Sequence, residues 1–300
     1  MYSLLLTAYN GAILGPIAKL LGYIMNVIFI VLDKIGIPNV GLCIILFTLI
    51  MYGLMTPLTY KQQKFSKLSQ RMNPELQAIQ AKYKNKKDQV SMQKMNDETR
   101  AIYDKYGVSP TGSCVQLLIT MPVLFALYRV IYAIPAYVSK IGDTYRVLAD
   151  KIISFDNAKF LQNSGIESIN KVINQYGQEL TKGENISNGV IDVISKISSS
   201  DLYTISDKYD LSKLTYNSQL IISKIDTNGK ILERGLLDTY NNFLGLNIGD
   251  SPSHIITTAW TNVNGIQWGI IIGALLIPIL AALSQWINTK LMPQPSDNKE

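Results

Sequence analysis

Hydroxyl and amide side chains recur at helical spacing inside the most apolar runs of this 300-residue chain. Residues four apart lie on the same face of a helix, so each set would form a polar stripe along an otherwise apolar helix. Such groups donate and accept hydrogen bonds but carry no charge at neutral pH. The three sets are Thr48, Tyr52 and Thr56, then Gln116 and Thr120, and finally Ser284, Gln285 and Asn288.

The spacing of these stripes leaves two interpretations open. In the first, the side chains form hydrogen bonds between helices, each contributing about 1 kcal/mol or less inside a membrane. In the second, the three stripes converge on a water-filled cavity that opens towards the cytoplasm. Most of these residues fall in the predicted cytoplasmic halves of their helices, which favours the cavity.

No set of residues has the spacing of a catalytic site. The single histidine, His254, lies in a Ser-Pro-Ser-His sequence without a convincing partner acid or nucleophile. A nucleotide-binding glycine loop, a His-Glu-x-x-His motif and a pair of Asp residues within an apolar run are all missing from the sequence. The three clear apolar runs contain no Asp, Glu or Lys, which argues against an ion or proton pump. We therefore expect no enzymatic activity, no cofactor and no metal.

Three other residues of the apolar runs receive structural interpretations. Cys43 and Cys114 lie at the edges of two runs, at a spacing that suits neither a metal site nor a disulfide framework. We expect both to be small buried hydrophobic residues. Arg129 is near the outer end of its run, where its guanidinium can reach the interface or a polar neighbour. A structural or interfacial role is favoured for Arg129 over contact with a substrate.

Three apolar runs are long enough to cross a bilayer, at residues 41–58, 114–138 and 265–288. A spanning helix needs roughly 20 mostly apolar residues, so the sequence indicates an integral membrane protein. A fourth run, residues 11–32, is interrupted by Pro16 and Lys19. This run could span the membrane or lie in the interface as an amphipathic helix.

The distribution of charge predicts the orientation of the chain. Residues 61–112 contain eleven Lys or Arg and five acidic residues, a net charge of +6. Residues 139–262 contain twelve basic and fourteen acidic residues, a net charge of −2. Because short positively charged loops stay in the cytoplasm, we predict that 61–112 is inside and 139–262 outside.

The basic segment predicts a helical hairpin. Its first helix leaves the membrane and continues towards Met72, and Asn73-Pro74-Glu75 then supplies a cap, a proline and an acid that predict a restart. A second helix is expected from about residue 89 to 106, with Gly107 as its C-terminal cap. The expected contacts between the arms are Ile79, Tyr83, Met95, Ile102 and Tyr103, and the cations expected to meet partners are Lys82, Lys84, Lys86 and Lys87.

The predicted fold is an all-α integral membrane protein, a helical bundle with a cytoplasmic helical hairpin and an inserted, mainly helical extracytoplasmic domain. Apolar periodicity over residues 166–176 and 190–197 supports helices in the insert, with a flexible loop as the alternative. The expected divisions are an interfacial or spanning N-terminal helix at 1–39, spanning helices at 40–60, 113–138 and 263–290, the hairpin at 61–112, the insert at 139–262 and a cytoplasmic tail at 291–300.

Four stretches resemble the YidC family of membrane-protein insertases. The sequence SPTGSCVQLLITMPVLFALYRV, residues 109–130, is similar to the family's most distinctive signature, and TLIMYGLMTPLTYKQQKFSKL, residues 48–68, resembles its preceding spanning helix. NPELQAIQAKYKNKKD, residues 73–88, resembles the start of its cytoplasmic hairpin. FLGLNIGDSP and LLIPILAALSQWINTKLMP resemble the stretch that leads into its next span.

The resemblance implies a function and a location. Members of the family insert short membrane proteins into the bacterial plasma membrane, alone or beside the Sec translocon, and assist their folding. A hydrophilic groove, open to the cytoplasm and the lipid but closed on the outside, carries this function and needs no cofactor. Partners implied for the hairpin are ribosomes, targeting factors and nascent membrane proteins, with charge rather than any specific nucleic-acid sequence favouring the encounter with ribosomal RNA. The family also has an amphipathic helix before the first span, which favours an interfacial position for residues 11–36.

Two features depart from the family pattern. Many members have an arginine in the groove at the position of Tyr52, and a tyrosine hydroxyl cannot attract an acidic tail by charge. The family core has two further spanning helices after the span that ends near Lys290, so either the chain is a fragment, which we favour, or another component completes the fold. Two rival functions remain, namely a transport or channel subunit whose polar stripes line a solute path, and a scaffold whose stripes only pack helices.

Overall fold

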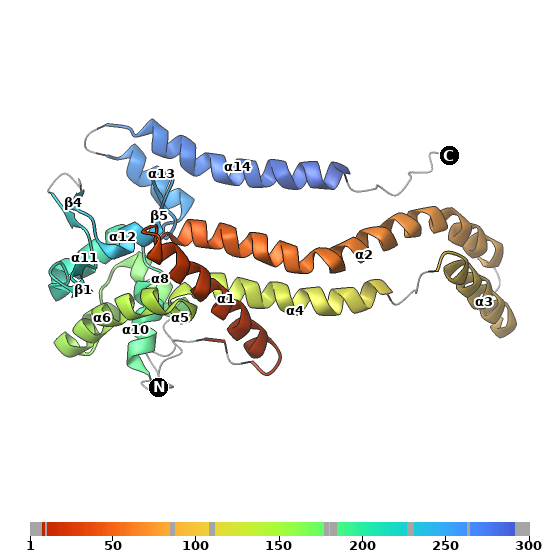
Figure 1. The fold of residues 1–300 in the computed structure, drawn as a ribbon, viewed down its shortest axis with the longest axis horizontal. Helices are drawn as coiled ribbons and strands as arrows, with labels where there is room; N and C mark the ends of the chain where they lie inside the picture. Colours follow the sequence, from red (N-terminus) through yellow and green to blue (C-terminus); the bar gives the residue numbers. More distant parts are fainter. Residues whose placement is uncertain are drawn as a thin grey trace. The chain divides into compact units, whose positions relative to one another are not determined.

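A computed structural model describes residues 8–9, 11–84, 88–107, 112–176, 180, 185–226, 231–262 and 265–291. Helices dominate this part of the chain (Figure 1). The helices are α1 Leu14–Lys34, α2 Val40–Tyr83, α3 Gln89–Lys105, α4 Gly112–Tyr132, α5 Ile134–Tyr137, α6 Ser139–Asp156, α7 Lys159–Gln162, α8 Glu167–Tyr176, α10 Ile186–Ile194, α11 Ser199–Tyr209, α12 Leu236–Asn241, α13 Pro252–Trp260 and α14 Trp268–Leu291. Three short antiparallel hairpins pair β1 Thr215–Tyr216 with β2 Gln219–Leu220, β3 Lys224–Ile225 with β4 Ile231–Glu233, and β5 Asn242–Phe243 with β6 Leu246–Asn247.

Three helices are long and apolar enough to cross a membrane, namely α1, α2 and α14. In the part of the chain that the structure describes, α4 contributes a shorter apolar helix from Thr120 to Tyr132. These lengths agree with an all-α membrane protein. The chain divides into two compact units, one made of Met1–Leu49 and Val123–Ile279 and the other of Ile50–Pro122 and Leu280–Glu300.

The hairpin of the second unit consists of the far end of α2 and of α3, which turns back along it (Figure 1). The predicted restart at residues 73–75 is wrong, because α2 continues through Pro74 to Tyr83. A proline inside a helix costs about 3 kcal/mol, but contacts on both sides of it compensate. Met72 is almost fully buried, and Glu75 is bonded to α3.

The start and end of α3 agree with the sequence. Asp88 is its N-cap and accepts a hydrogen bond from the Ser91 backbone N–H at 2.9 Å. Gly107 follows the helix with φ of 62°, the left-handed conformation expected of a glycine at a C-terminal cap.

The first unit joins α1 to the base of the insert, residues 139–262. α1 buries one face, including Ala18, Met25 and Phe29. At Gly22 a Cβ atom would lie 2.2 Å from the Tyr137 ring, so α5 approaches α1 as closely as glycine permits. Asp33, near the end of α1, pairs with Lys140 of α6 at 2.5 Å.

The insert has its own hydrophobic core, in which α6 packs against α10 and α11, and α8 against α10. The predicted helical patterns are confirmed as α8 and α10. Buried apolar side chains of α6 and α10, among them Leu148, Ile152 and Ile191, form the centre of this core. The β hairpins were not predicted, because strands of two or three residues leave no periodic pattern.

Candidate functional site

The first polar stripe lies on α2 as the sequence predicts. Thr48 Oγ1 donates to the Ile44 carbonyl at 2.7 Å, and Thr56 Oγ1 donates to the Tyr52 carbonyl at 2.7 Å. Both hydroxyl protons are therefore used within the helix, while each oxygen keeps acceptor capacity. The Tyr52 side chain is 70% exposed and extends from an apolar helix.

The other two stripes are placed on α4 and α14. Ser284 Oγ donates to the Ala281 carbonyl of its own helix at 3.0 Å, and Gln285 and Asn288 are exposed along the same helix. Thr120 is half-buried on α4. Gln116 lies on α4, and its side chain falls outside the described part of the structure. The convergence of the stripes therefore stays a prediction.

The hairpin contains an internal repeat that the sequence interpretation missed. The two copies read ELQAIQAKY at 75–83 and ETRAIYDKY at 98–106. Both copies share Glu, Ala, Ile, Lys and Tyr at the same five positions. A comparison of the sequence with itself at an offset of 23 residues would have found it.

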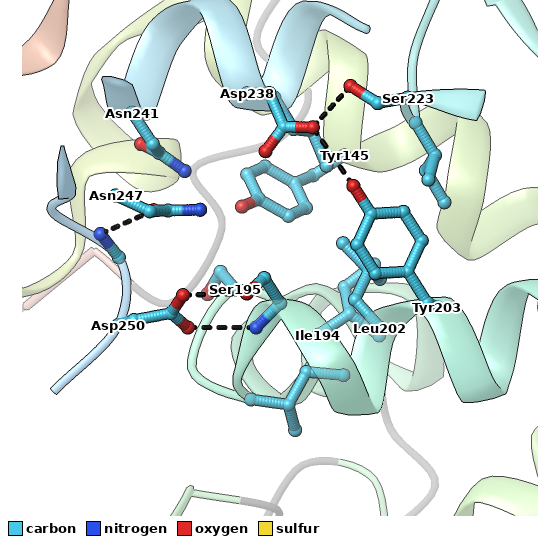
Figure 2. A pocket seen from close by; sticks show the side chains of 15 residues that line it. Tyr145, Ile194, Ser195, Leu202, Tyr203, Ser223, Asp238, Asn241, Asn247 and Asp250 are labelled. Carbon is cyan, nitrogen blue, oxygen red and sulfur yellow. Dashed lines mark hydrogen bonds between the residues drawn. The ribbon is translucent and has the colours of Figure 1, made fainter. Parts of the chain in front are cut away.

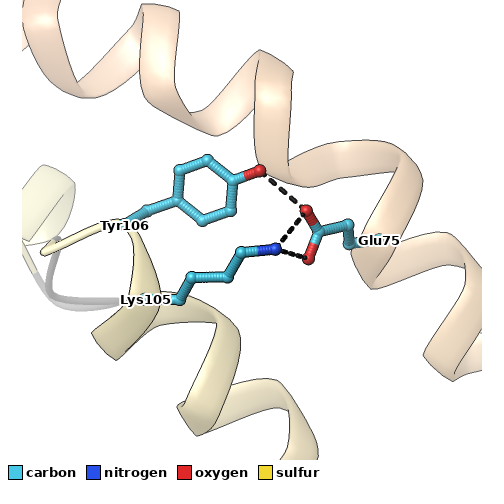
Figure 3. Close-up of polar contacts among 3 residues, drawn as sticks. All are labelled: Glu75, Lys105 and Tyr106. Atoms are coloured by element: carbon cyan, nitrogen blue, oxygen red, sulfur yellow. Dashed lines mark hydrogen bonds and ion pairs between the residues drawn. The ribbon is translucent and has the colours of Figure 1, made fainter.

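The repeat forms two reciprocal contacts between antiparallel helices. Glu98 of α3 accepts from Lys82 Nζ at 2.6 Å and from the Tyr83 hydroxyl at 2.9 Å, both on α2. In the second contact the roles of the helices are exchanged (Figure 3). There Glu75 of α2 accepts from Lys105 Nζ at 2.9 Å and from the Tyr106 hydroxyl at 2.7 Å, both at the end of α3.

These contacts shift the pKa of the glutamate that joins the two helices. The hydrogen bond from Lys82, and then the one from Tyr83, lowers the pKa of the Glu98 carboxyl. Lys82 is thereby committed to an intramolecular pair, whereas Lys84 is exposed at the end of α2. Lys86 and Lys87 lie outside the described residues.

Arg129 and Lys196 both contact aromatic rings near the end of α4, and the structural or interfacial role of Arg129 stays a prediction. The Arg129 guanidinium lies 4.9 Å from the centre of the Tyr9 ring. The Lys196 ammonium lies 3.7 Å from the centre of the Tyr132 ring and donates to the Tyr132 carbonyl at the end of α4. Burial lowers the pKa of Lys196 to about 8, against the raising effect of Asp192.

A small cavity of about 40 Å³, lined by both polar and apolar side chains, lies within the insert (Figure 2). Asp238 accepts from the Tyr203 hydroxyl at 3.1 Å and from Ser223, and Asp250 accepts from the backbone and hydroxyl of Ser199 at 2.8 and 2.6 Å. Both carboxylates are thus satisfied by the surrounding protein, which fits a structural network.

The surroundings of His254 and Cys43 fit structural rather than catalytic roles. His254 Nε2 lies 3.3 Å from Ser200 Oγ. Within the described part of the chain, this pair lacks the bonded carboxylate that orients the histidine of a Ser-His-Asp triad. Cys43 is fully buried, with its Sγ 3.5 Å from the Met25 carbonyl, as expected for a small core residue.

Comparison with known proteins decides the family. A family model described as "60Kd inner membrane protein" matches residues 19–225, more than half of the chain. The chain belongs to this family. The resemblance to YidC proteins is thereby confirmed, and with it the assignment as a multi-pass protein of the bacterial cell membrane.

Curated proteins similar in sequence to this chain are named as membrane protein insertases. The chain is 36% identical to "Membrane protein insertase YidC" of Bifidobacterium longum over 127 residues, which are 41% of this chain and 38% of that protein. It is 37% identical to the protein of the same name from Oceanobacillus iheyensis, over 38% of this chain and 45% of that protein. It is also 37% identical to "Membrane protein insertase MisCA" of Bacillus subtilis, over 41% of this chain and 44% of that protein. In each case the match spans less than half of the relative, and no solved structure matches the chain.

Proposed function

We propose that this YidC-family protein inserts membrane proteins into the bilayer and assists their folding, through a hydrophilic groove open to the cytoplasm. The observation that carries the proposal is the exposed Tyr52 phenol on an apolar helix, in a chain whose relatives are named membrane protein insertases. No covalent step is involved, so the groove residues act by solvation and positioning alone.

The groove is proposed to be lined by the three polar stripes. A polar tail of a substrate resists transfer into hydrocarbon, because an unpaired polar group there costs several kcal/mol. Water held by hydroxyl and amide groups shortens the dry distance that such a tail must cross. The threonine oxygens retain acceptor capacity after bonding to their own helix, and Tyr52 can both donate and accept. The apolar part of the substrate then leaves along the lipid-facing side.

The α2–α3 hairpin is proposed to lie in the cytoplasm and meet the ribosome, targeting factors or the nascent chain. The net charge of +6 over residues 61–112 supports this position and favours encounter with ribosomal RNA. Lys84 is exposed at the turn between the helices, whereas Lys82 is held by Glu98. We therefore assign electrostatic contact to Lys84 and its neighbours in sequence, and intramolecular support to Lys82. Cooperation with the Sec translocon belongs to the same proposal.

The insert is proposed to be extracytoplasmic, with α1 in the interface beneath it. Contacts along the length of α1 support this placement. Asn26 accepts from the Ser139 backbone N–H at 3.0 Å, and the Phe29 ring meets Tyr240 edge-on at 5.5 Å. Since α1 contacts the insert from Asn26 to Asp33, lying along its base satisfies these contacts better than crossing the bilayer.

The groove can be tested by changing Thr48, Tyr52 and Gln116 together to leucine. We expect insertion of a short test protein into proteoliposomes to be lost while the variant keeps its thermal unfolding transition. Leu54→Ala is the matched control, because Leu54 is an exposed apolar residue of α2 outside the stripe. Insertion that survives the triple change would refute the groove, and leakage of ions through the wild-type protein would favour a channel.

A gain of function sharpens the same test. In Tyr52→Arg, a positive charge enters the proposed groove, so insertion of substrates with acidic tails should rise relative to the same substrates with neutral tails. The ratio of the two insertion yields measures the effect independently of protein amount. An unchanged ratio would contradict the position of Tyr52 in the groove.

A further inference from the structure

The β5–β6 hairpin has an unusual turn. Its central residues, Leu244 and Gly245, have φ of 53° and 82°. Turns with two positive φ values favour asparagine, aspartate and glycine, and leucine is disfavoured there because its Cβ meets the backbone. Leu244 is also 86% exposed, the largest exposed fraction of any large apolar side chain in the described part of the protein. A strained leucine that is also exposed calls for an explanation outside the fold.

A second hairpin of the same unit shows the contrast. The β1–β2 turn has the same two-residue form, with φ of 50° at Asn217 and 64° at Ser218. Both of its central residues are polar and exposed, as expected for a turn in water. The two turns therefore share backbone geometry and differ in the character of the side chain at the first central position.

Contacts at its base attach the β5–β6 hairpin to the ends of two spanning helices. Asn39 caps α2 through its side chain, which accepts from the Leu42 N–H at 3.0 Å and donates to the Asn242 carbonyl at 2.6 Å. A Cβ atom at Gly41 would lie 2.6 Å from the Phe243 ring, so the ring rests directly on the first turn of α2.

On the other side the hairpin meets α14. A Cβ atom at Gly273 would lie 3.5 Å from Leu246 Cδ1. Gly273 is five residues inside α14, so this contact is about 7.5 Å along the helix from its first residue. That first residue, Trp268, forms an edge-on pair with Trp260 at 5.9 Å, and both indoles are more than half exposed. Exposed tryptophans at the end of a spanning helix mark the membrane interface.

We propose that the Leu244-Gly245 turn is a lipid contact, in which the Leu244 side chain enters the acyl chains at the boundary of the leaflet that surrounds the Val40 end of α2. The depth follows from the contact with Gly273, which lies on the hydrocarbon side of the tryptophan pair. The backbone is suited to this position, because the Gly245 N–H donates to Asn242 Oδ1 at 3.2 Å and so needs no water. Apolar contact with lipid offsets the unfavourable φ of a leucine.

Spin labels on matched turns test the depth. The 300-residue chain, with Cys43 and Cys114 replaced by alanine, is labelled at Leu244→Cys or at Asn217→Cys and placed in nanodiscs of phosphatidylethanolamine and phosphatidylglycerol. At position 244 we expect more collisions with oxygen, which partitions into acyl chains, than with a water-soluble nickel chelate. At position 217 the order should reverse. A label at 244 that meets the nickel chelate would overturn the proposal, and one shielded from both reagents would overturn it in favour of contact with protein.

The change in melting temperature caused by Leu244→Asn should have opposite signs if the turn lies in water or in lipid, and Asn217→Leu is the reciprocal substitution. In water, Leu244→Asn should raise the apparent melting temperature, because asparagine tolerates positive φ better than leucine. In lipid, the same change should lower it, because the amide must lose its water. We expect a lower melting temperature in nanodiscs, and a higher one would refute the lipid contact. Asn217→Leu should lower the melting temperature in any case, which confirms that leucine is costly in such a turn.

Discussion

In the insert, helices are held together by side chains that water does not reach. Leu148 and Ile191 are buried between α6 and α10, and the fully buried Tyr209 bonds to two other elements. In the α2–α3 hairpin, the ion pairs that join the helices are exposed, and the Lys82 and Glu98 side chains keep 57% and 38% of their surface in water. Buried packing fixes one arrangement strongly, whereas exposed ion pairs contribute little and weaken with salt. We therefore expect the insert to resist local unfolding more strongly than the hairpin.

We expect the largest loss of stability from shortening a buried apolar side chain of the insert. Leu148→Ala removes a fully buried side chain from the core of the insert and should destabilise it by about 2–5 kcal/mol. Ile102→Ala in the hairpin is the matched control, because Ile102 is at the edge of burial with 9% of its surface exposed. Hydrogen–deuterium exchange of peptides from the insert and from the hairpin measures the effect of each substitution on local stability. Equal losses of protection in the two regions would break the comparison.

A buried hydrogen bond provides the next test. The Tyr209 hydroxyl donates to Asp156 at 3.0 Å and accepts from the Leu161 N–H at 3.1 Å. Tyr209→Phe keeps the ring and leaves both partners without this bond, which should cost about 1–3 kcal/mol. Exchange should accelerate at Leu161 and across α7, while the hairpin peptides stay unchanged. Tyr216→Phe is the control, because its hydroxyl makes a long contact of 3.5 Å at the surface.

Lys196 makes the stability of the insert depend on pH above neutrality. Burial lowers its folded-state pKa to about 8, whereas the ordinary value is 10.5. Between these values the unfolded chain binds more protons than the folded one, so the contribution of Lys196 to stability should rise as pH increases above 8. The stability of the insert, measured by thermal unfolding at pH 7 to 9, should show this rise relative to Lys196→Met. The difference between the two proteins isolates Lys196 from the tyrosines that begin to titrate in the same range. A difference that does not change with pH would contradict the depressed pKa.

The sequence predicts the elements better than the contacts between them. Periodicity is sufficient for α8 and α10, and Gly107 correctly predicts the end of α3, whereas its N-cap Asp88 was not predicted. Continuation of α2 through Pro74 could not be predicted, because the compensating contacts come from a helix some thirty residues later. Lys196 binding the Tyr132 carbonyl joins residues 64 apart, and no local pattern encodes such a cap. The three polar stripes follow from spacing alone, whereas the predicted convergence would depend on helix packing that spacing does not specify.

The smallest expected effect tests the exposed half of the comparison. Glu98→Gln removes the charge that joins α3 to Lys82 and Tyr83, so amide exchange in α3 should accelerate, most clearly at low salt. The charge-swapped pair Lys82→Glu with Glu98→Lys should restore part of the protection. Because the folded-state pKa of Glu98 is lowered, its contribution is present above the ordinary value of 4.5 and is lost as pH falls through the lowered pKa.

Glu167→Gln is the matched control for the hairpin. Glu167 pairs with Lys171 at 2.8 Å, but both residues lie on α8, so no second helix depends on the bond. We expect Glu167→Gln to leave exchange in α3 unchanged and to alter α8 only slightly. If Glu98→Gln had no more effect on the hairpin than Glu167→Gln has on α8, the reciprocal contacts of the repeat would not hold the hairpin closed. The buried residues between the arms, led by Met72 and Tyr83, would then hold the hairpin, and it would resemble the insert rather than contrast with it.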